Sequence, residues 1–472
     1  MILHRDGPDG REVLLVRRGK DLRFAGGWHA FPGGRLDPAD RELAVPGLAP
    51  DDAALLVCAV RELFEEAGVL IARGAERIPA DERATARRAL LAGALPFPRL
   101  LAAHGLVLDP AALVPAGRWV TPEHLPIRYD ARLFLAPLPP GEHPEIWPGE
   151  LSDGGMVAPS RALARWARGE ALLHPPNLNA LRVLARPGPI ALAALRDPAG
   201  VEGFAARRIE FQEGFFLAAL RTPTLPPATH TNTWLVPAED GLAVVDPGAP
   251  DPAEQARLFS VLDELAAEGR PPRAVWLTHA HPDHVGAVAA VAARHGVAVR
   301  AHPGAASTLE VAVTPLRDGD RLGRFRVLET PGHAREHLAF LDEETGALLC
   351  GDMVSTLSTI VIDPPEGDMA EYVRQLERLR DLEPRTLYPA HGPPAPDGAA
   401  RLDQYLAHRR AREQQLLDAL ATPATLEDVT ARAYADTPPG LHPVAARSCL
   451  AGLEKLRGEG RVEERAGVWR LR

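Results

Sequence analysis

The sequence predicts an α/β protein built from three domains. At 472 residues the chain is longer than one core usually supports, since single domains commonly have about 150 residues. From residue 206 to residue 400, short apolar runs alternate with stretches of helical periodicity, which is typical of layered α/β architecture. The residues that follow have mainly helical periodicity. We therefore expect domains at residues 1–205, 206–400 and 401–472.

The composition is that of an ordinary globular protein and excludes several classes. Hydrophobic residues make up 46% of the chain and charged residues 25%, while the formal charge of −10 argues against bulk attraction to nucleic acid. Cys58, Cys350 and Cys449 lie far apart, which excludes a disulfide framework and fits a reducing compartment. No stretch reaches the ~18 apolar residues of a membrane span, and the first residues lack a signal-peptide core. We expect a cytoplasmic protein without a membrane partner. Arginine is abundant and lysine occurs only at Lys20 and Lys455, a bias typical of a GC-rich bacterium.

The first domain begins with a strand, a glycine-rich turn and a helix. The strand is expected at 12–16 and the turn at 24–34. Asp51 or Asp52 can cap the helix, and Gly68 is its natural stop. The rest of the domain is expected to contain strands at 119–122 and 132–136, helices at 160–168 and 177–185, and a link that starts near 197–200.

Three carboxylates lie on one face of that helix. Glu62, Glu65 and Glu66 are spaced i, i+3 and i+4, so they are neighbours on the helical surface. Like charges at this spacing destabilise a bare helix, and a bound divalent cation would reverse the penalty. Oxygen ligands suit magnesium or manganese. The alternative is a solvated acidic face without a metal.

The glycine turn and the stretch from Arg61 to Val69 together resemble the Nudix box of enzymes that hydrolyse nucleoside diphosphate conjugates. The resemblance implies a Nudix α/β/α domain in which Glu62, Glu65 and Glu66 hold magnesium or manganese against the diphosphate. Arg61 would brace the helix. Among these carboxylates, Glu66 is the catalytic candidate.

The box departs from the standard pattern in its first half. Arg61 lies 27 residues after Gly34, about twice the standard spacing, which indicates an insertion. The glutamate that the box places between them falls at Ala53 when counted back from Arg61. We keep Gly34 and Arg61 as ligand-site residues. A competent diphosphatase and a degenerate module that only senses a ligand remain as alternatives.

A second motif in this domain concerns its ligand. A set of residues resembles the motif of coenzyme A diphosphatases, with departures at Val16 and Gly19: Leu14, Leu15, Arg18, Arg23, Gly27 and 31–34. The arginines could grip phosphates bidentately. Glu150 could supply one more carboxylate or could be an ordinary loop acid.

The second domain contains a dense group of metal-competent side chains. His279, His281, Asp283 and His284 follow the apolar run 274–277, which reads as a buried strand. We expect a tight loop here, because proline should delay the start of the next helix. Imidazole nitrogen and carboxylate oxygen are ligands that suit zinc.

Three further candidates follow later strands. His333, Asp352 and His391 each come after a short apolar run that ends in a glycine- or proline-containing turn. Taken singly, each could be a turn residue. Their joint occurrence after the histidine-rich loop makes the case for a shared metal site.

From 206 to 400 the pattern resembles the metallo-β-lactamase superfamily. The resemblance implies an αββα sandwich with two zinc ions at one edge. One zinc would be held by His279, His281 and His333, and the other by Asp283, His284 and His391, with Asp352 bridging both. Two zinc ions would lower the pKa of a shared water, and the hydroxide would attack an ester, thioester or phosphodiester. Asp283 is the catalytic candidate of this domain.

Three more residues have open roles. Asp246, at the end of the strand 242–245, could orient a metal ligand or simply cap a turn. His230 and His337 are candidates for the edge of the site.

The tail has helical patterns at 402–419, 425–435 and 443–457, followed by a two-stranded wing at 461–471. It resembles the winged helix of a metallo-β-lactamase branch that includes an RNA-cleaving hydrolase. Residues 405–472 hold eleven Lys and Arg against nine Asp and Glu. This small excess leaves RNA binding, packing and a homodimer contact as alternatives.

The leading hypothesis is an enzyme with two hydrolase sites: a dinuclear zinc hydrolase of esters, thioesters or phosphodiesters, and a Nudix diphosphatase acting on conjugates such as coenzyme A. The alternative is a single-stranded RNA endonuclease with a degenerate, ligand-sensing Nudix domain. The expected partners are a small-molecule substrate and, under the alternative, RNA.

Overall fold

The computed structural model describes residues 1–8, 10–20, 22, 25–121, 128–196 and 208–472. The chain divides into two compact units, Met1–Ala206 and Arg207–Arg472. The predicted link near 197–200 and the predicted boundary between 205 and 206 lie outside the described residues. No helix in the described part of the chain is both long and apolar enough to cross a membrane.

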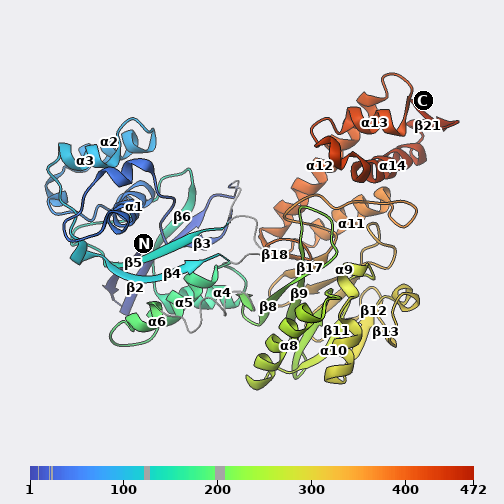
Figure 1. The fold of residues 1–472 in the computed structure, drawn as a ribbon, viewed down its shortest axis with the longest axis horizontal. Coiled ribbons are helices and arrows are strands. Elements are labelled where there is room, and N and C mark those ends of the chain that lie inside the picture. The colour runs from blue at the N-terminus through green and yellow to red at the C-terminus, as the bar shows by residue number, and fades with distance from the viewer. Residues whose placement is uncertain (9, 21, 23–24, 122–127, 197–207) are drawn as a thin grey trace. The chain divides into compact units, whose positions relative to one another are not determined.

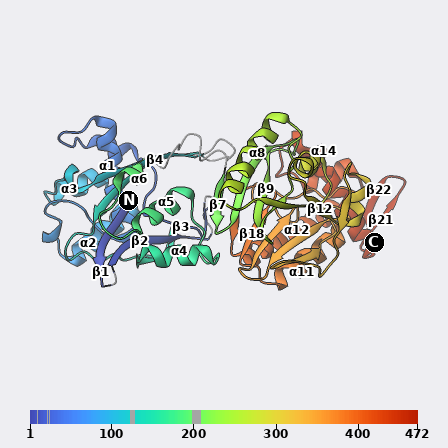
Figure 2. The same ribbon diagram turned by 90° about the horizontal axis from the view of Figure 1, so that it is seen from below.

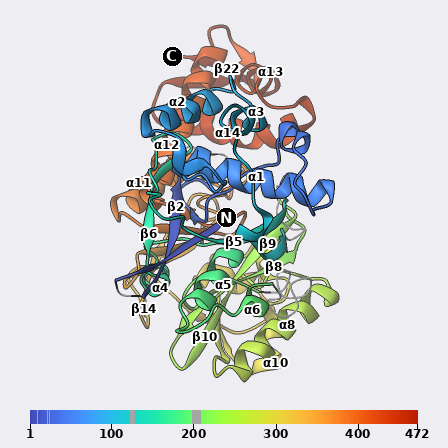
Figure 3. The same ribbon diagram turned by 90° about the vertical axis from the view of Figure 1, so that its left-hand side faces the viewer.

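The first unit is a mixed sheet between two groups of helices (Figures 1 and 3). Its strands run in the order β3-β2-β1-β5-β4, and β6 also pairs with β2. They are β1 (Ile2–Gly7), β2 (Gly10–Arg18), β3 (His29–Ala30), β4 (Val114–Val120), β5 (Asp130–Pro137) and β6 (Leu151–Val157). The helices are α1 (Pro50–Ala67), α2 (Ala80–Leu91), α3 (Phe97–Ala103), α4 (Pro159–Ala167), α5 (Pro175–Leu184) and α6 (Leu192–Arg196), with short η1 (Pro38–Glu42), η2 (Ala75–Arg77) and η3 (Pro110–Ala112).

Strand β2 is apolar on both sides because helices cover both faces of the sheet. Leu14 and Val16 pack in the core that contains α1, α2 and α3. Val13 and Leu15 point the other way, into the core with α4 and α5. This alternation explains why the strand is a continuous hydrophobic run.

Helix α1 starts differently from the prediction. Its N-cap is Ala49, with Pro50 at the first helical position, and no side chain caps it. Asp51 and Asp52 lie in the first turn instead, where proline has already fixed the backbone for the helix. Gly68 ends the helix in the left-handed conformation (φ 70°), as predicted.

The second unit contains two sheets packed face to face between helices. One sheet has the order β13-β12-β11-β10-β9-β8-β7 and the other β14-β15-β16-β17-β18-β19. The first consists of β7 (Ile209–Gln212), β8 (Phe215–Arg221), β9 (His230–Ala238), β10 (Gly241–Val245), β11 (Pro272–Trp276), β12 (Ala298–Ala301) and β13 (Val313–Pro315). The second consists of β14 (Arg321–Leu322), β15 (Phe325–Glu329), β16 (Leu338–Asp342), β17 (Ala347–Gly351), β18 (Thr386–Pro389) and β19 (Ala395–Pro396).

Helices α8 (Pro252–Ala267) and α10 (Val288–His295) cover the first sheet, and α11 (Met369–Asp381) and α12 (Gly398–Ala419) cover the second (Figures 1 and 2). Val275 on β11 packs toward α8 and α10. Its neighbour Trp276 points between the sheets, with ring centroids 5.3 Å from Phe325 and 5.4 Å from Phe340. The layers are those of the expected αββα sandwich.

One local expectation in this unit is wrong. Proline does not delay the helix after the histidine-rich loop: α9 (Pro282–Val285) begins at Pro282 itself. Proline is favoured at the first position of a helix, where its missing N–H would have no partner anyway. Asp283 and His284 therefore lie on a helical turn.

The chain ends in a three-helix module with a small sheet. Helix α12 leads into α13 (Leu426–Ala433), η5 (Pro439–Leu441) and α14 (His442–Gly458). The short η4 (Pro303–Ser307) is not part of this module; it lies between β12 and β13. The sheet has the order β20-β22-β21, formed by β20 (Ala424–Thr425), β21 (Val462–Arg465) and β22 (Val468–Leu471). The two-stranded wing is present, and β20 adds a strand that was not predicted.

Candidate metal centre

The seven predicted ligands of the second unit converge from four places in the chain. His279 and His281 follow β11, and Asp283 and His284 lie on α9. The other three follow β15, β17 and β18: His333, Asp352 and His391. Because these strands end at one edge of the sandwich, residues more than 100 positions apart in the chain meet there.

Three histidine nitrogens form the first group. His281 Nδ1 lies 3.0 Å from His279 Nε2 and 3.0 Å from His333 Nε2. Three ring nitrogens gathered at one point, on side chains of two separate segments, are the arrangement that a metal ion needs.

The second group contains one carboxylate and two histidines. Asp283 Oδ2 lies 3.5 Å from His391 Nε2 and 3.9 Å from His284 Nε2. Asp352 faces both groups. Its Oδ1 lies 3.4 Å from His391 Nε2, and its Oδ2 lies 3.5 Å from His333 Nε2.

Two buried atoms of this cluster have no hydrogen-bond partner among the described residues: His284 Nε2 and Asp352 Oδ1. A buried polar atom without a partner is costly, and a bound cation would satisfy both atoms. Within each candidate group, the ligand atoms lie within 4.8 Å of one another. The residues therefore fit divalent metal ions, held by nitrogen and oxygen.

Asp246, which directly follows β10, holds the histidine-rich loop through hydrogen bonds to Thr278 and His284. Its carboxylate accepts hydrogen bonds from Thr278 N (2.8 Å) and Thr278 Oγ1 (2.6 Å), and lies 3.0 Å from His284 Nδ1. Thr278 Oγ1 also lies 3.0 Å from His279 Nδ1. Asp246 thus orients one histidine directly and another through Thr278, from a left-handed backbone (φ 50°).

The electrostatics of the site follow from crowding and burial. Burial lowers the pKa of His284, but the carboxylates of Asp283 and Asp246 outweigh it and raise the pKa to about 10. Burial and the neighbouring histidines hold the pKa of His279 well below its usual value. Burial opposes the charge on Asp352, yet His391 and His284 keep its pKa well below its usual range. The low pKa of Asp352 thus keeps its carboxylate ionised beside the close imidazoles.

Backbone carbonyls orient two further ligands. His333 Nδ1 lies 2.9 Å from Val361 O, and His391 Nδ1 lies 3.1 Å from His230 O. The role found for His230 in this site is therefore that of its carbonyl. His281 Nε2 lies 3.3 Å from Glu366 Oε1, so a carboxylate faces the outer side of that ring.

His337 is a fixed internal support. It is fully buried, accepts from Asp352 N through Nε2 (3.1 Å), and its Nδ1 lies 2.7 Å from Thr330 Oγ1. Burial, and then His333, hold its pKa well below its usual value, so it is a neutral ring that fixes the backbone of Asp352. Sequence reasoning placed it at the edge of the site, because a lone histidine gives no sign of its depth.

In the first unit, Arg61 is the centre of a buried ionic cluster. It donates to Asp40 through Nε and Nη2 (both 2.9 Å), and through Nη1 to Glu62 and Glu65 (both 2.9 Å). Arg61 also donates to Arg35 O. These hydrogen bonds tie α1 to η1 and to the turn at Arg35.

Asp40 was missed by the sequence analysis. Counting back from Arg61 led to Ala53, which is buried in the apolar core. Counting forward from Gly34 leads to Asp40, because the extra residues follow Asp40 rather than precede it. The fully buried Asp40 also caps η1 by accepting from Asp37 N (2.8 Å).

The three glutamates of α1 are close but do not converge. Glu62 and Glu65 face Arg61, whereas Glu66 accepts from Gly33 N (2.8 Å). In the described part of the chain, every cluster of three or more close metal-competent groups lies in the second unit. The donor atoms are of the kind that magnesium or manganese prefers, but Arg61 holds two of the three carboxylates.

Burial and mutual repulsion raise the pKa values of the glutamates on α1. Burial raises the pKa of Glu66 to about 8 and that of Glu62 to about 7, and Glu150 contributes to both shifts. Glu150 receives a hydrogen bond from Arg18 Nη2 (3.0 Å). Gly34 has a steric role, because a Cβ there would collide with the carboxylate of Glu62. Arg23 lies outside the described residues.

Family models match all three parts of the chain. The metallo-beta-lactamase superfamily model matches residues 226–313 and 316–391, the NUDT19 Nudix domain model residues 41–184, and the beta-lactamase associated winged helix domain model residues 425–469. The three predicted domains are thus each matched by a family model of their own, in the order Nudix, metallo-beta-lactamase and winged helix. These family matches, with a hydrolase among the relatives, support a metal-dependent hydrolase, and the mixed α/β fold class is confirmed.

Two curated relatives match the metallo-beta-lactamase part. The beta-lactamase-like protein 2 homolog of Drosophila melanogaster is 28% identical over 252 residues, covering 49% of this chain and 84% of the relative. The hydroxyacylglutathione hydrolase of Hahella chejuensis is 36% identical over 180 residues, covering 36% of this chain and 65% of the relative.

Two solved structures match the two units of the fusion. A beta-lactamase domain protein from Burkholderia ambifaria is 23% identical, with a TM-score of 0.51, covering 57% of this chain and 94% of that one, which shows the fold. A NUDIX hydrolase from Alicyclobacillus acidocaldarius is 34% identical, with a TM-score of 0.37, covering 41% of this chain and 94% of that one.

Proposed function

We propose that the second unit is a dinuclear zinc hydrolase of acyl esters or thioesters, and that the Nudix domain hydrolyses nucleoside diphosphate conjugates such as coenzyme A. One observation carries the zinc hydrolase proposal: imidazole nitrogens and carboxylate oxygens meet in a buried cluster. In it, Asp352 faces both groups of ligands. We assign one metal to His279, His281 and His333, and the other to Asp283, His284 and His391, with Asp352 shared. The proposed domains are residues 1–205, 206–400 and 401–472.

Bound zinc ions would supply an activated water and polarise the oxygen of the scissile group. The chain's own residues hold that arrangement in place. Asp246 and His337 fix His284 and Asp352 in position, so little reorganisation is needed when substrate binds. Asp283 is the carboxylate that we place closest to the reacting atoms.

The charge around the site favours a small acyl substrate over RNA. A groove of about 700 Å³ borders the metal centre at Glu366, the residue that faces His281. Its walls carry five acids and two bases: Glu366, Asp368, Glu371, Glu454, Glu459, Arg335 and Lys455. A polyanion would be repelled there.

Most positive side chains of the winged helix are paired with acids and so are poorly placed to bind RNA. Of the eleven Lys and Arg in 405–472, eight form ion pairs with Asp or Glu. Ser448 and Arg447 of α14, the third helix of the module, contact the hydrolase loop at Ile362 and Asp363. These contacts support a packing role and count against the RNA endonuclease alternative.

The Nudix proposal rests on Asp40. It restores an acidic partner for Arg61, and with it the buried support of the glutamate helix. A ligand-sensing module without activity is the alternative. We propose Glu62, Glu65 and Glu66 as the magnesium or manganese ligands of the active form.

A substrate panel tests both sites. Acyl thioesters, acyl esters, coenzyme A and single-stranded RNA are incubated with wild type, His284→Ala and Glu66→Gln, and metal content is measured for each protein. Thioester hydrolysis should be lost in His284→Ala only, and magnesium-dependent diphosphatase activity in Glu66→Gln only.

The matched controls are His295→Ala on α10 and the exposed Glu82→Gln on α2, which should keep both activities. RNA cleavage that depends on His284, without thioester hydrolysis, would overturn the acyl assignment. Absence of diphosphatase activity in wild type would favour the sensing module.

A further inference from the structure

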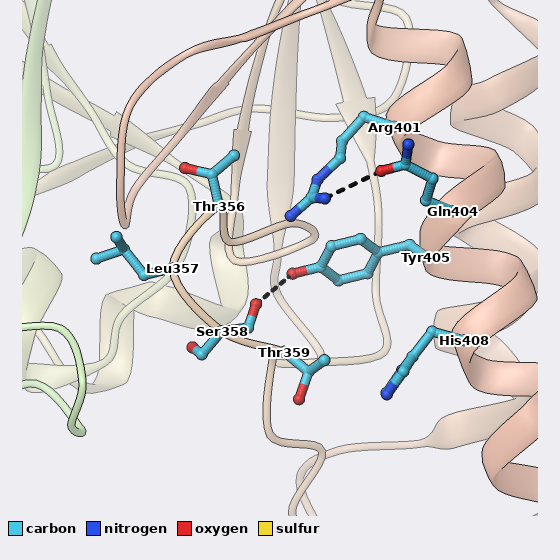
Figure 4. A pocket seen from close by; sticks show the side chains of 8 residues that line it. All are labelled: Thr356, Leu357, Ser358, Thr359, Arg401, Gln404, Tyr405 and His408. Carbon is cyan, nitrogen blue, oxygen red and sulfur yellow. Dashed lines mark hydrogen bonds between the residues drawn. The ribbon is translucent and has the colours of Figure 1, made fainter. Parts of the chain in front are cut away.

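A small cavity of about 290 Å³, lined by several hydrogen-bonding side chains, lies between a loop and helix α12 (Figure 4). Its lining comes from the loop residues Thr356, Leu357, Ser358 and Thr359 and from Arg401, Gln404, Tyr405 and His408. The four helix residues recur at helical spacing and so share one face of α12, opposite the hydroxyl-bearing loop.

The cavity is connected to the metal centre through the backbone. The loop leaves β17 just after Asp352, and Thr356 N donates to the carbonyl of His391 (3.1 Å). Thr356 Oγ1 donates to Pro393 O (2.7 Å), two residues beyond that ligand. The cavity wall is therefore one backbone hydrogen bond away from His391, a ligand of the proposed second metal.

The lining is rich in donors that have no partner. Arg401 has no carboxylate partner in the described part of the chain, and only Gln404 Oε1 and Ser355 O accept from its guanidinium. Its Nε is buried without a hydrogen bond, as is His408 Nδ1. Ser358 and Thr359 are exposed at the mouth of the cavity, where their hydroxyls make no hydrogen bond to any described residue, and no acidic side chain lines the cavity.

The walls are held rigidly, so the donors are fixed before a ligand arrives. Tyr405 Oη accepts from Ser355 N (2.8 Å) and lies 2.8 Å from Ser358 O, which ties the loop to α12. The Arg401 guanidinium lies over the Tyr405 ring, 5.4 Å from its centroid. This fixed geometry reduces the ordering cost of binding.

We propose that this cavity binds a phosphate group of the substrate, so that the substrate of the metal centre is a phosphorylated acyl ester or thioester. The proposal rests on the proposed acyl hydrolase function. The guanidinium of Arg401, the hydroxyls of Ser358 and Thr359 and the amide of Gln404 present donors beside one positive charge and no acid, which suits an anion with several terminal oxygens such as a phosphate. Arginine provides the charge that holds it.

Two thioesters that differ only in a phosphate provide the test: S-acetyl-pantetheine and S-acetyl-4′-phosphopantetheine. Wild type should have a KM that is about 10–100-fold lower for the phosphorylated thioester, and Arg401→Gln should remove that advantage. In Arg401→Gln, the KM for the unphosphorylated thioester should change far less than the KM for the phosphorylated one. Arg401→Lys should recover part of the advantage.

Arg401 also donates to Ser355 O, so Arg401→Gln could act by disturbing the loop. A second variant that leaves this bond intact tests for that effect. Ser358→Ala removes one cavity hydroxyl and should raise the KM for the phosphorylated thioester alone. The control Arg410→Gln, on the exposed side of α12, should behave as wild type. A KM advantage that is absent in wild type, or that survives in Arg401→Gln, overturns the phosphate site.

Equilibrium binding separates failure of this proposal from failure of the proposed function. Titration calorimetry on the metal-loaded protein compares 4′-phosphopantetheine, inorganic phosphate and pantetheine. If no thioester is hydrolysed but phosphopantetheine binds in an Arg401-dependent way, the acyl function is wrong and the phosphate site stands. If S-acetyl-glutathione shows the Arg401-dependent advantage instead, the cavity recognises a carboxylate and the phosphate assignment is overturned.

Discussion

Two buried aspartates hold the charged sites of this fusion in place. Asp246 fixes the histidine-rich loop of the metal centre, and Asp40 fixes Arg61 on the glutamate helix. Each carboxylate is almost completely buried and accepts hydrogen bonds from groups far along the chain. Removing one partner of such a buried pair is costly, because the other charge then stays buried and uncompensated.

Replacing Asp40 by Ala should destabilise the Nudix domain by about 3–5 kcal/mol, because Arg61 would remain buried without its bidentate partner. The matched control is Asp51→Ala, which breaks the exposed Arg41–Asp51 pair and should cost less than about 1 kcal/mol. Hydrogen-exchange mass spectrometry of α1 peptides in the full chain measures both. Equal protection in the two variants would contradict the role of Asp40.

At the scale of residues, ligands that lie close together in the chain can be predicted from their spacing. Partners that are far away in the chain cannot be predicted in this way. His279 to His284 lie together in the chain, so their convergence is local. Asp40 was hidden by an insertion, since the count from Arg61 fails once residues are added between them. The carbonyls of Val361 and His230 could not be found, because any residue carries a carbonyl.

At the scale of elements, helices α12 and α14 clamp the loop between β17 and α11. Arg409 on α12 donates to Ile360 O (2.6 Å), and Ser448 on α14 accepts from Ile362 N (3.0 Å). Between these two anchored residues lies Val361, whose carbonyl orients His333. The winged helix module thus reaches the metal centre through one short loop.

Replacing Ser448 by Ala should cost about 1–3 kcal/mol, because Ile362 N loses its acceptor in a buried place. Because Val361 would then be less well held, metal retention should weaken several-fold, up to about tenfold. Chelator titration and thermal unfolding report the two effects. Ser448→Thr should restore retention, and the exposed Ser307→Ala should match wild type. Equal retention in the Ala and Thr variants would rule out the clamp.

Elements with a clear apolar period were predictable, whereas short ones were not. The runs at 12–16 and 274–277 are strands because helices or a second sheet cover both of their faces. The two-residue strands β3 and β20 carry too few residues to show a period. Helix α9 was missed because proline was read as a delay, although it favours the first position of a helix.

At the scale of the whole molecule, buried titratable groups make the stability of the first unit depend on pH. In the first unit, His174 is buried and stacked on Trp28, with ring centroids 4.2 Å apart. Burial, and then the charge of Arg18, lower its pKa to about 4. Glu62 and Glu66, with pKa values raised by burial to about 7 and about 8, act in the opposite sense. Three domains could be expected from chain length, but these buried groups could not, because burial depends on the folded packing.

Replacing His174 by Phe should make the Nudix domain less sensitive to acid. In wild type, the unfolded chain binds a proton at His174 below about pH 6.5, whereas the folded chain does so only near pH 4, so stability is lost as pH falls through this window. Each pKa unit corresponds to about 1.4 kcal/mol of unfolding free energy. Between neutral pH and pH 4, His174→Phe should therefore lose about 2–3 kcal/mol less stability than wild type.

The comparison isolates His174 because Glu62 and Glu66 are unchanged in both proteins. Phenylalanine keeps an aromatic ring against Trp28, so the stack is preserved. Urea unfolding from pH 4 to pH 8, followed by hydrogen exchange in α5 peptides, gives the difference in slope between wild type and His174→Phe. The exposed His143→Gln serves as control and should keep the wild-type slope. A slope in His174→Phe identical to that of wild type would show that the folded protein binds the proton as readily as the unfolded chain, because only a pKa difference between the two states makes stability depend on pH.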